Sequence, residues 1–531
     1  MTTTRKLLLL FFQGRLNHLH MISVGLLSFI IGCSPGNQTK NQINQWKTES
    51  RNLLKQQHLL FWYHGVQGMK IHLKESFENH QELLSLPTIQ RVINAMNETR
   101  TPGETQELRF LKNFLMQKYL AMRIAMLNDS MRQIFQTAVI TNQQQRFLFR
   151  DLPFRLVQTS DPVQRKQAYM AAQPVRQQLA QLLAQKYQQI SRIVKQLGYP
   201  NYTEFIAEGY EIHPHDLLTL SDTLLKQTAS EFRQLTQQLQ QLYHLPDPIG
   251  EWDIPLLRSG KYFDAYVPTD QLLAQQHLFL RALGIDPKRQ TGLTESLTSG
   301  PEKVYYRLMI PIDIPGDIRL SLKRQQHFED FWQLFYLIGQ AEHYIHTEIS
   351  SWINQQLGSP TMRKVYGYLF ASVWQNPAWL RHALPMSEKD SLFFSQYVRW
   401  YQLHQLRYYA VTFREGFSAF QQTNLSHDQW QTIAQHMVQN ALPEFGWDVL
   451  NAEFDPYLTA ALELEAMIIA SQLEHYLKNN FGENWFENPG SSKFLKSLWW
   501  RGNEIPIHFV LKKINQPRLT STFLLKPIES R

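Results

Sequence analysis

Asp317-Ile-Arg-Leu-Ser-Leu322, followed shortly by Phe328-Glu-Asp-Phe-Trp-Gln-Leu-Phe-Tyr-Leu-Ile-Gly-Gln-Ala-Glu-His343, is the most informative part of this sequence. In the first segment apolar and polar residues alternate, which predicts a short β-strand. The second segment belongs to the helical periodicity that runs through most of the chain, and Met362-Arg-Lys-Val-Tyr-Gly-Tyr-Leu-Phe370 continues it. The order strand, helix, second helix is therefore the first structural prediction.

The rest of the chain, from about residue 45 onward, is predicted to be mostly α-helical. One apolar stripe with spacings of three and four comprises Val175, Leu179, Leu182, Leu183, Tyr187, Ile190, Ile193, Val194 and Leu197. Gly198 ends this stripe as a C-cap glycine would. A strand is also predicted at residues 304–310, and turn clusters at residues 246–250, 291–301 and 314–316. Because no internal repeat or long linker is present, residues 46–531 are predicted to form one large helical body with a small β element.

The composition describes an ordinary globular chain. Of 531 residues, 43% are hydrophobic and 18% are charged, which is enough apolar material for a large core. The formal net charge of +8 is mild, and the basic residues are scattered, so nucleic acid is not an expected partner. A single cysteine excludes an internal disulfide framework and a thiolate metal cluster.

That cysteine, Cys33, lies at the end of an apolar run that starts at Met21 and is too short to span a bilayer. The tetrad Ile30-Ile31-Gly32-Cys33 resembles the bacterial lipobox, in which a small residue precedes the cysteine that is acylated. We therefore predict a lipoprotein signal peptide over residues 1–32, lipidation of Cys33 and a turn-rich tether over residues 33–45. An uncleaved N-terminal anchor is the alternative, and Met21 is an alternative start.

Lipidation would place the protein in a bacterial cell envelope, attached to a membrane through Cys33. Ser34 follows the cysteine, where an aspartate is associated with retention in the inner membrane. This favours the outer membrane, with the body facing the periplasm.

Five phrases of the chain, in the same order, resemble the oligoendopeptidase and thimet-oligopeptidase-like zinc metallopeptidases. These are gluzincins related to the angiotensin-converting-enzyme group. The phrases are Leu197-Gly-Tyr-Pro-Asn-Tyr202, residues 317–343, residues 362–380, Gln405-Leu-Arg-Tyr-Tyr-Ala410 and residues 470–502. In the family the 328–343 helix carries His-Glu-x-x-His, and the next helix supplies a glutamate as third zinc ligand. The resemblance covers about residues 150–515 and implies a mostly α, two-lobed body with a deep channel and a small β element.

The chemistry departs from the family. In a gapless match the two zinc histidines correspond to Tyr336 and Gln340, the general-base glutamate to Leu337, and the third ligand to Lys364. A lysine ammonium has no lone pair for zinc, and leucine cannot accept a proton from a metal-bound water. The tyrosine that many relatives aim at the oxyanion corresponds to Glu463, whose carboxylate would repel developing negative charge. The alternative for Lys364 is an exposed helix residue that touches no cleft.

The remaining candidates for metal binding are Glu342, His343, His346 and the distant His404. His343 and His346 are spaced i, i+3, so both imidazoles share a helix face. A histidine at the first of these positions is also part of the ordinary helix packing of the family. No cofactor is therefore expected, and zinc only if an atypical site is used.

The family resemblance, together with the replacement of the zinc ligands, implies a catalytically inactive homologue, a pseudopeptidase that binds a peptide or protein segment. Active relatives hold extended peptides against a strand edge, and Asp317 and Arg319 are the candidate binding residues on the predicted strand. Two alternatives remain: an active oligopeptidase-type metallopeptidase with an atypical metal site, and a structural scaffold of the envelope.

Overall fold

The computed structural model describes residues 35–143, 145–422, 425–440 and 454–525. The chain divides into two compact units, Met1–Asn44 and Gln45–Arg531. Cys33 and the predicted signal peptide lie outside the described residues. The helices are α1 (Pro35–Gln67), α2 (Leu73–Ser76), α3 (Leu86–Glu98), α4 (Pro102–Arg123), α5 (Ala125–Thr137), α6 (Leu152–Gln158), α7 (Pro162–Ala171), α8 (Gln173–Gln196), α9 (Tyr202–Tyr210), α10 (Pro214–Gln227), α11 (Ala229–Leu242), α12 (Ile254–Ser259), α13 (Leu272–Ala282), α14 (Phe328–Ile345), α15 (Trp352–Gln356), α16 (Thr361–Ala371), α17 (Pro377–Ala383), α18 (Glu388–Gln421), α19 (His427–Asn440), α20 (Pro456–Phe481), α21 (Pro489–Trp499) and α22 (Ile507–Lys513).

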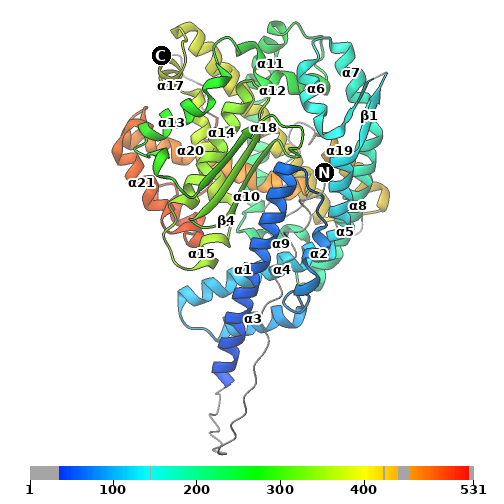
Figure 1. The fold of residues 1–531 in the computed structure, drawn as a ribbon, viewed down its shortest axis with the longest axis vertical. Helices are drawn as coiled ribbons and strands as arrows, with labels where there is room; N and C mark the ends of the chain where they lie inside the picture. Colours follow the sequence, from blue (N-terminus) through cyan, green and yellow to red (C-terminus); the bar gives the residue numbers. More distant parts are fainter. Residues whose placement is uncertain (1–34, 144, 423–424, 441–453, 526–531) are drawn as a thin grey trace, which may run out of the picture. The chain divides into compact units, whose positions relative to one another are not determined.

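The prediction of a mostly α fold with a small β element is confirmed (Figure 1). Helix α8 shows why the periodicity was informative, because Leu179, Leu183, Tyr187 and Ile190 are all buried along one face. Gly198 has φ +90°, and its backbone N–H donates to the carbonyl of Lys195. The predicted glycine end of this helix is therefore present.

The turn-rich conformation predicted for the tether at residues 33–45 is wrong for the residues that the structure describes, because α1 already begins at Pro35. Proline is favoured in the first turn of a helix, where its missing N–H has no partner to lose. The glutamines and lysine that follow are good helix formers despite their polarity. No helix in the described ranges combines the length and the apolarity that crossing a bilayer requires.

Two small sheets are present among the described residues. One is a hairpin of β1 (Val139–Asn142) and β2 (Gln145–Leu148). The other has the strand order β3-β5-β4, in which β5 (Asp317–Lys323) pairs parallel with β3 (Leu293–Thr298) and antiparallel with β4 (Arg307–Asp313). The strands predicted at residues 304–310 and 317–322 thus correspond to β4 and β5.

Strand β3 corrects the prediction of a turn cluster over residues 291–301. Its sequence, Leu-Thr-Glu-Ser-Leu-Thr, is largely polar and its side chains are only half-buried. The strand exists because it pairs with β5, from Leu293 opposite Ile318 to Thr298 opposite Lys323. This pairing is not local, so residue composition could not reveal it.

The core lies around α14, which packs against α16, β4 and β5, while α20 packs against α16. Residues 328–344 of α14 are all buried, so this helix has no solvent face. A helix buried all round belongs to the interior of a large protein. Strand β5 and helix α14, which contain residues 317–322 and 328–343, therefore lie at the centre of the larger unit.

Candidate functional site

A buried carboxylate, Glu463 of α20, binds two of the three side chains that correspond to zinc ligands in the metallopeptidase resemblance, Tyr336 and Lys364. Lys364 of α16 donates from Nζ to Glu463 Oε1 at 2.7 Å. The hydroxyls of Tyr336 and Tyr368 donate to Glu463 Oε2 at 2.8 and 2.9 Å. Lys364 is only 7% exposed, so the alternative of an exposed helix residue is wrong.

These four residues, Tyr336, Lys364, Tyr368 and Glu463, are called the Glu463 cluster. Its one negative charge, on Glu463, is paired with its one positive charge, on Lys364. Burial alone would raise the pKa of Glu463, but the positive charges of Lys364 and Arg307 and the hydrogen bonds to the carboxylate outweigh it and lower the pKa. Burial, followed by the charge of Glu463, raises the pKa of Tyr336 and Tyr368 well above the usual value. The cluster therefore contains one carboxylate, one ammonium and two protonated phenols.

Two glycines bring α14 and α16 close enough for the cluster to form. A Cβ on Gly339 would lie 2.3 Å from the carbonyl oxygen of Tyr366, and a Cβ on Gly367 would lie 2.7 Å from that of Tyr336. Side chains at either position would push the helices apart. The internal glycine of the family phrase, matched by Gly339, has this packing role here.

Five polar residues of α14 form a stripe with spacings of three and four, and each has a partner from another element. Three of the five accept hydrogen bonds from arginines: Glu329 from Arg258, Gln333 from Arg307 and Gln340 from Arg363. The fourth, His343, lies 3.1 Å from Asn503 Oδ1. Tyr336 lies in the middle of this stripe, with the Arg307 guanidinium 4.6 Å from its ring centroid. Buried polar groups must be paired in this way to be tolerated.

This set of residues does not fit a zinc ion. Tyr336 is a protonated phenol bound to Glu463, and Lys364 places a positive charge where the cation would need a negative ligand. Gln340 is bound to Arg363, and Leu337 is a buried apolar side chain. No group of three or more histidine, cysteine, aspartate or glutamate side chains that could hold a metal is found in the part of the chain that the structure describes.

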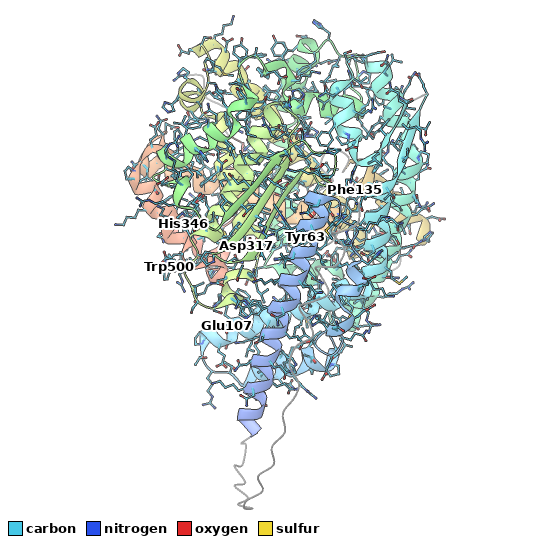
Figure 2. The ribbon with its side chains drawn as sticks, in the orientation of Figure 1. Tyr63, Glu107, Phe135, Asp317, His346 and Trp500 are labelled. Carbon is cyan, nitrogen blue, oxygen red and sulfur yellow. The ribbon has the colours of Figure 1, made fainter. Side chains whose placement is uncertain are left out.

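His343 and His346 do not converge on one point. His343 stacks on Tyr366, with ring centroids 5.3 Å apart. His346 follows the last residue of α14, stacks on Trp499 at 5.4 Å, and lies 3.1 Å from a Glu342 oxygen. Figure 2 shows His346 at the left side of the view, where Figure 1 labels α21. The two imidazoles thus have separate aromatic neighbours.

The prediction that residues 317–322 offer a free strand edge is wrong, because β5 is paired on both sides. Peptide addition to a sheet needs an edge with unpaired backbone groups. Asp317 and Arg319 form a bidentate pair with both distances at 2.7 Å. Arg319 also lies over Trp62 of α1, and its guanidinium is hydrogen-bonded to the side chain of Tyr63 in the same helix. These two residues therefore fix α1 on the sheet.

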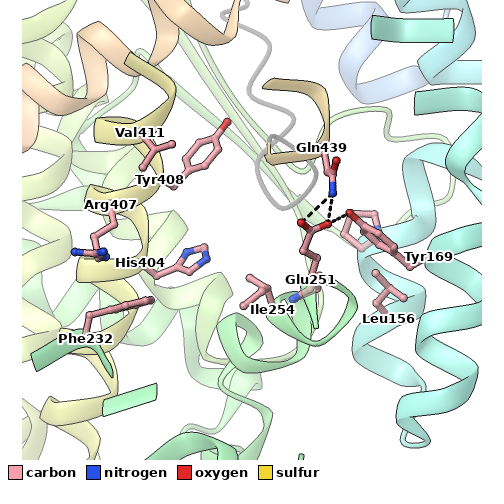
Figure 3. Close-up of a pocket in the computed structure, with 12 residues that line it drawn as sticks. Leu156, Tyr169, Phe232, Glu251, Ile254, His404, Arg407, Tyr408, Val411 and Gln439 are labelled. Atoms are coloured by element: carbon pink, nitrogen blue, oxygen red, sulfur yellow. Dashed lines mark hydrogen bonds between the residues drawn. The ribbon is translucent and has the colours of Figure 1, made fainter. Parts of the chain in front are cut away.

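A cavity with a mostly apolar lining lies elsewhere, between α6, α7, α11, α12, α18 and α19 (Figure 3). Its volume is about 280 Å³, near the lower end of small-molecule pockets. A hollow beside His58 and Asn503 measures only about 60 Å³, which suits a few water molecules. The 280 Å³ cavity is called the α18 cavity below.

The α18 cavity has one acidic wall and one aromatic wall (Figure 3). Glu251, in the short 3-10 helix Glu251–Asp253, accepts from the Tyr169 hydroxyl and from the Gln439 amide at 2.9 Å. On the other wall, His404 lies near Phe232, with ring centroids 6.4 Å apart. Burial, together with the charge of Arg258, lowers the pKa of His404 to about 3, so its imidazole is neutral.

Sequence reasoning considered His404 only as a distant metal candidate and did not identify Glu251. A signal was present on α18, because His404, Tyr408 and Val411 follow a spacing of four and three and all line the cavity. No such signal marks Glu251, which reaches the cavity from a different part of the chain.

No protein-family model matches the chain, and no curated protein matches it significantly.

Proposed function

We propose that this protein is a catalytically inactive homologue of the oligoendopeptidase and thimet-oligopeptidase-like zinc metallopeptidases, exported and anchored through Cys33, that binds a peptide or protein segment. One observation carries the loss of catalysis. The buried Lys364–Glu463 pair, at 2.7 Å, lies where the resemblance would put the third zinc ligand and the oxyanion tyrosine.

The charge balance of the Glu463 cluster supports this proposal. A divalent cation there would face an ammonium and two protonated phenols, and Glu463 would have to exchange three short hydrogen bonds for one metal bond. No side chain in the cluster can act as a base towards water, because the only carboxylate is bound to Lys364 and has a lowered pKa. Neither the nucleophile nor the electrophile of a metallopeptidase would be generated.

The binding half of the proposal is supported by the α18 cavity, and no longer by strand addition to β5. A peptide bound there would be recognised by its side chains or by one end, since the lining is made of helices and presents no strand edge. Specificity would then come from the shape and charge of the cavity.

The test uses the purified protein without its signal peptide. We expect metal analysis to find less than stoichiometric zinc, and a mixture of fluorogenic peptides to remain uncleaved with added zinc. The same peptides should show saturable binding by fluorescence anisotropy. Stoichiometric zinc that is lost in the His343→Ala and His346→Ala variants, together with chelator-sensitive cleavage, would establish the active alternative instead.

Anchoring is tested separately in cells. The wild-type chain should fractionate with membranes, and the Cys33→Ala variant should be released or remain as an unprocessed precursor. A Ser34→Ala variant is the matched control and should behave as the wild type. Identical fractionation of Cys33→Ala and the wild type would contradict lipidation.

A further inference from the structure

We infer that the α18 cavity binds a small organic ammonium ion with an apolar, ring-sized body. This inference concerns the cavity in which the proposed function places a side chain or an end of a peptide, and it rests on that assignment of the cavity to a ligand; it does not use the resemblance to metallopeptidases. It is based on the acidic wall at Glu251, on the aromatic wall at Phe232 and His404, and on the positions of the charged groups around the cavity (Figure 3).

The ammonium would bind at Glu251. The hydrogen-bond donors to this carboxylate among the described residues are neutral: the Tyr169 hydroxyl, and the Gln439 amide, which lies 3.0 and 2.9 Å from the two carboxylate oxygens. A carboxylate has about four lone-pair positions, so acceptor capacity remains. Glu251 is also exposed, so an incoming cation can reach it. A charge-assisted hydrogen bond is the stronger kind and would fix one end of the ligand.

The body of the ligand would pack against the opposite wall. Val411 supplies aliphatic surface, and Phe232 and His404 supply ring faces, while Ile254 lies between this wall and Glu251 (Figure 3). His404 is also near Trp400, at 5.4 Å between ring centroids, so its ring is held within an aromatic group. Its Nδ1 is buried and has no hydrogen-bond partner among the described residues. A polar atom on the ligand ring would satisfy this nitrogen.

Two guanidinium groups also lie near the cavity. Arg176 lies 3.9 Å from the Tyr169 ring centroid and interacts electrostatically with Glu251, so it offsets part of the negative charge of that carboxylate. Arg407 lines the cavity, and its guanidinium lies 5.2 Å from the Phe232 ring centroid and donates to the Leu225 carbonyl and the Thr228 hydroxyl. Its positive charge disfavours an ammonium at the aromatic end. The cation is therefore directed to Glu251 and the uncharged ring to Phe232. A volume of about 280 Å³ accommodates one ring with a short amine chain.

The experiment compares three probes of nearly the same shape by isothermal titration calorimetry: 2-phenylethylamine, 2-phenylethanol and 3-phenylpropionate. We expect saturable binding of the amine, binding weaker by about tenfold or more for the alcohol, and none for the carboxylate. Binding of the amine should weaken as salt is added. Preference for the carboxylate, or no saturable binding of the amine, would overturn the inference.

Three variants locate the site. Glu251→Gln keeps the shape and removes the charge, so the affinity for the amine should fall about tenfold and its salt dependence should disappear. Val411→Trp should abolish binding by filling the cavity. Glu98→Gln changes an exposed carboxylate at the end of α3 and should leave binding unchanged. Each variant is first checked for an unchanged melting temperature; an equal loss in Glu98→Gln would show nonspecific attraction and would contradict the site.

Discussion

Lys364 and Glu463 form a buried ion pair, and each charge is tolerated in the interior only because the other neutralises it. Removing both charges from water is expensive, and their attraction compensates for this only when further hydrogen bonds are made. Here Tyr336 and Tyr368 supply those bonds. The pair is therefore tolerated as a unit, and loss of one member leaves the other charge buried.

The first prediction concerns this dependence. Glu463→Leu should lower the free energy of unfolding by about 3–5 kcal/mol, because the Lys364 ammonium stays buried without its counter-ion. Adding Lys364→Met to that variant should recover part of the loss. Urea unfolding of both variants and of Lys364→Met alone gives the coupling energy. A double variant as unstable as the sum of the two single variants would show that the pair is not coupled.

The second prediction tests whether the scaffold can still hold zinc. The substitutions Tyr336→His, Leu337→Glu, Gln340→His, Lys364→Glu and Glu463→Tyr together would place His-Glu-x-x-His on α14 and a carboxylate on α16. We expect about one zinc ion per molecule by metal analysis, since these ligand types and spacings suit tetrahedral zinc. The same protein with Lys364 retained is the control and should bind zinc much more weakly. Equal zinc contents would refute the positional match.

At the residue scale, the sequence indicated which positions to compare but not how they interact. Matching phrases pointed to Tyr336 and Lys364, and both contact the same carboxylate. Glu463 was expected only to repel an oxyanion, because nothing in the sequence shows that α20 faces α16 at this position. Its role as counter-ion to Lys364 depends on a contact between residues 99 positions apart.

At the scale of secondary structure, the contact between α14 and α16 depends on missing side chains. The backbones meet at Gly339 and Gly367, where added Cβ atoms would overlap carbonyl oxygens. Glycine normally weakens a helix, by about 1 kcal/mol relative to alanine. Its presence in the middle of α14 is explained by this close approach.

The third prediction follows from that contact. Gly339→Ala should lower the free energy of unfolding by about 2 kcal/mol or more, because the new methyl group overlaps the Tyr366 carbonyl and outweighs the better helix propensity. Gly103→Ala in α4 is the matched control, since no atom lies within 4 Å of its added Cβ. That variant should be neutral or slightly stabilised. Equal effects in the two variants, measured by urea unfolding, would refute the close contact.

The elements themselves were predictable to the extent that their stabilising contacts are local. The apolar stripe of α8 and its terminal glycine belong to one segment and could be recognised. The pairing of β3 with β5 joins residues 25 positions apart in sequence, such as Leu293 and Ile318, and polar composition concealed it. The same pairing makes β5 a central strand, which alternation alone cannot distinguish from an edge strand.

For the whole molecule, buried neutral histidines link stability to pH. Burial lowers the pKa of His58 to about 3 and that of His64 and His343 to about 4. Each imidazole binds a proton more readily in the unfolded chain, near pH 6.5, than in the folded one. Their contribution is fully present above pH 6.5 and is lost as the pH falls towards the folded pKa. His213 acts in the opposite sense, because its hydrogen bond to Glu465 raises its pKa.

The fourth prediction isolates one of these histidines. The stability of the wild type minus that of His343→Gln should shrink as the pH is lowered from 7 to 5, by up to about 2 kcal/mol. Groups that titrate identically in both proteins cancel in this difference. Guanidinium chloride unfolding at several pH values provides the measurement. Parallel curves for the two proteins would mean that His343 binds protons equally well in the folded and unfolded chains.

The Lys364–Glu463 pair also constrains how the sequence can evolve. Replacing Lys364 by glutamate alone would place two carboxylates against each other, and replacing Glu463 alone would strand an ammonium in the interior. Each single substitution towards a metal centre thus lowers the stability of the fold before it can contribute to catalysis. Substitutions at these two positions are therefore expected to occur together, and single changes at either one do not lead towards a metal centre.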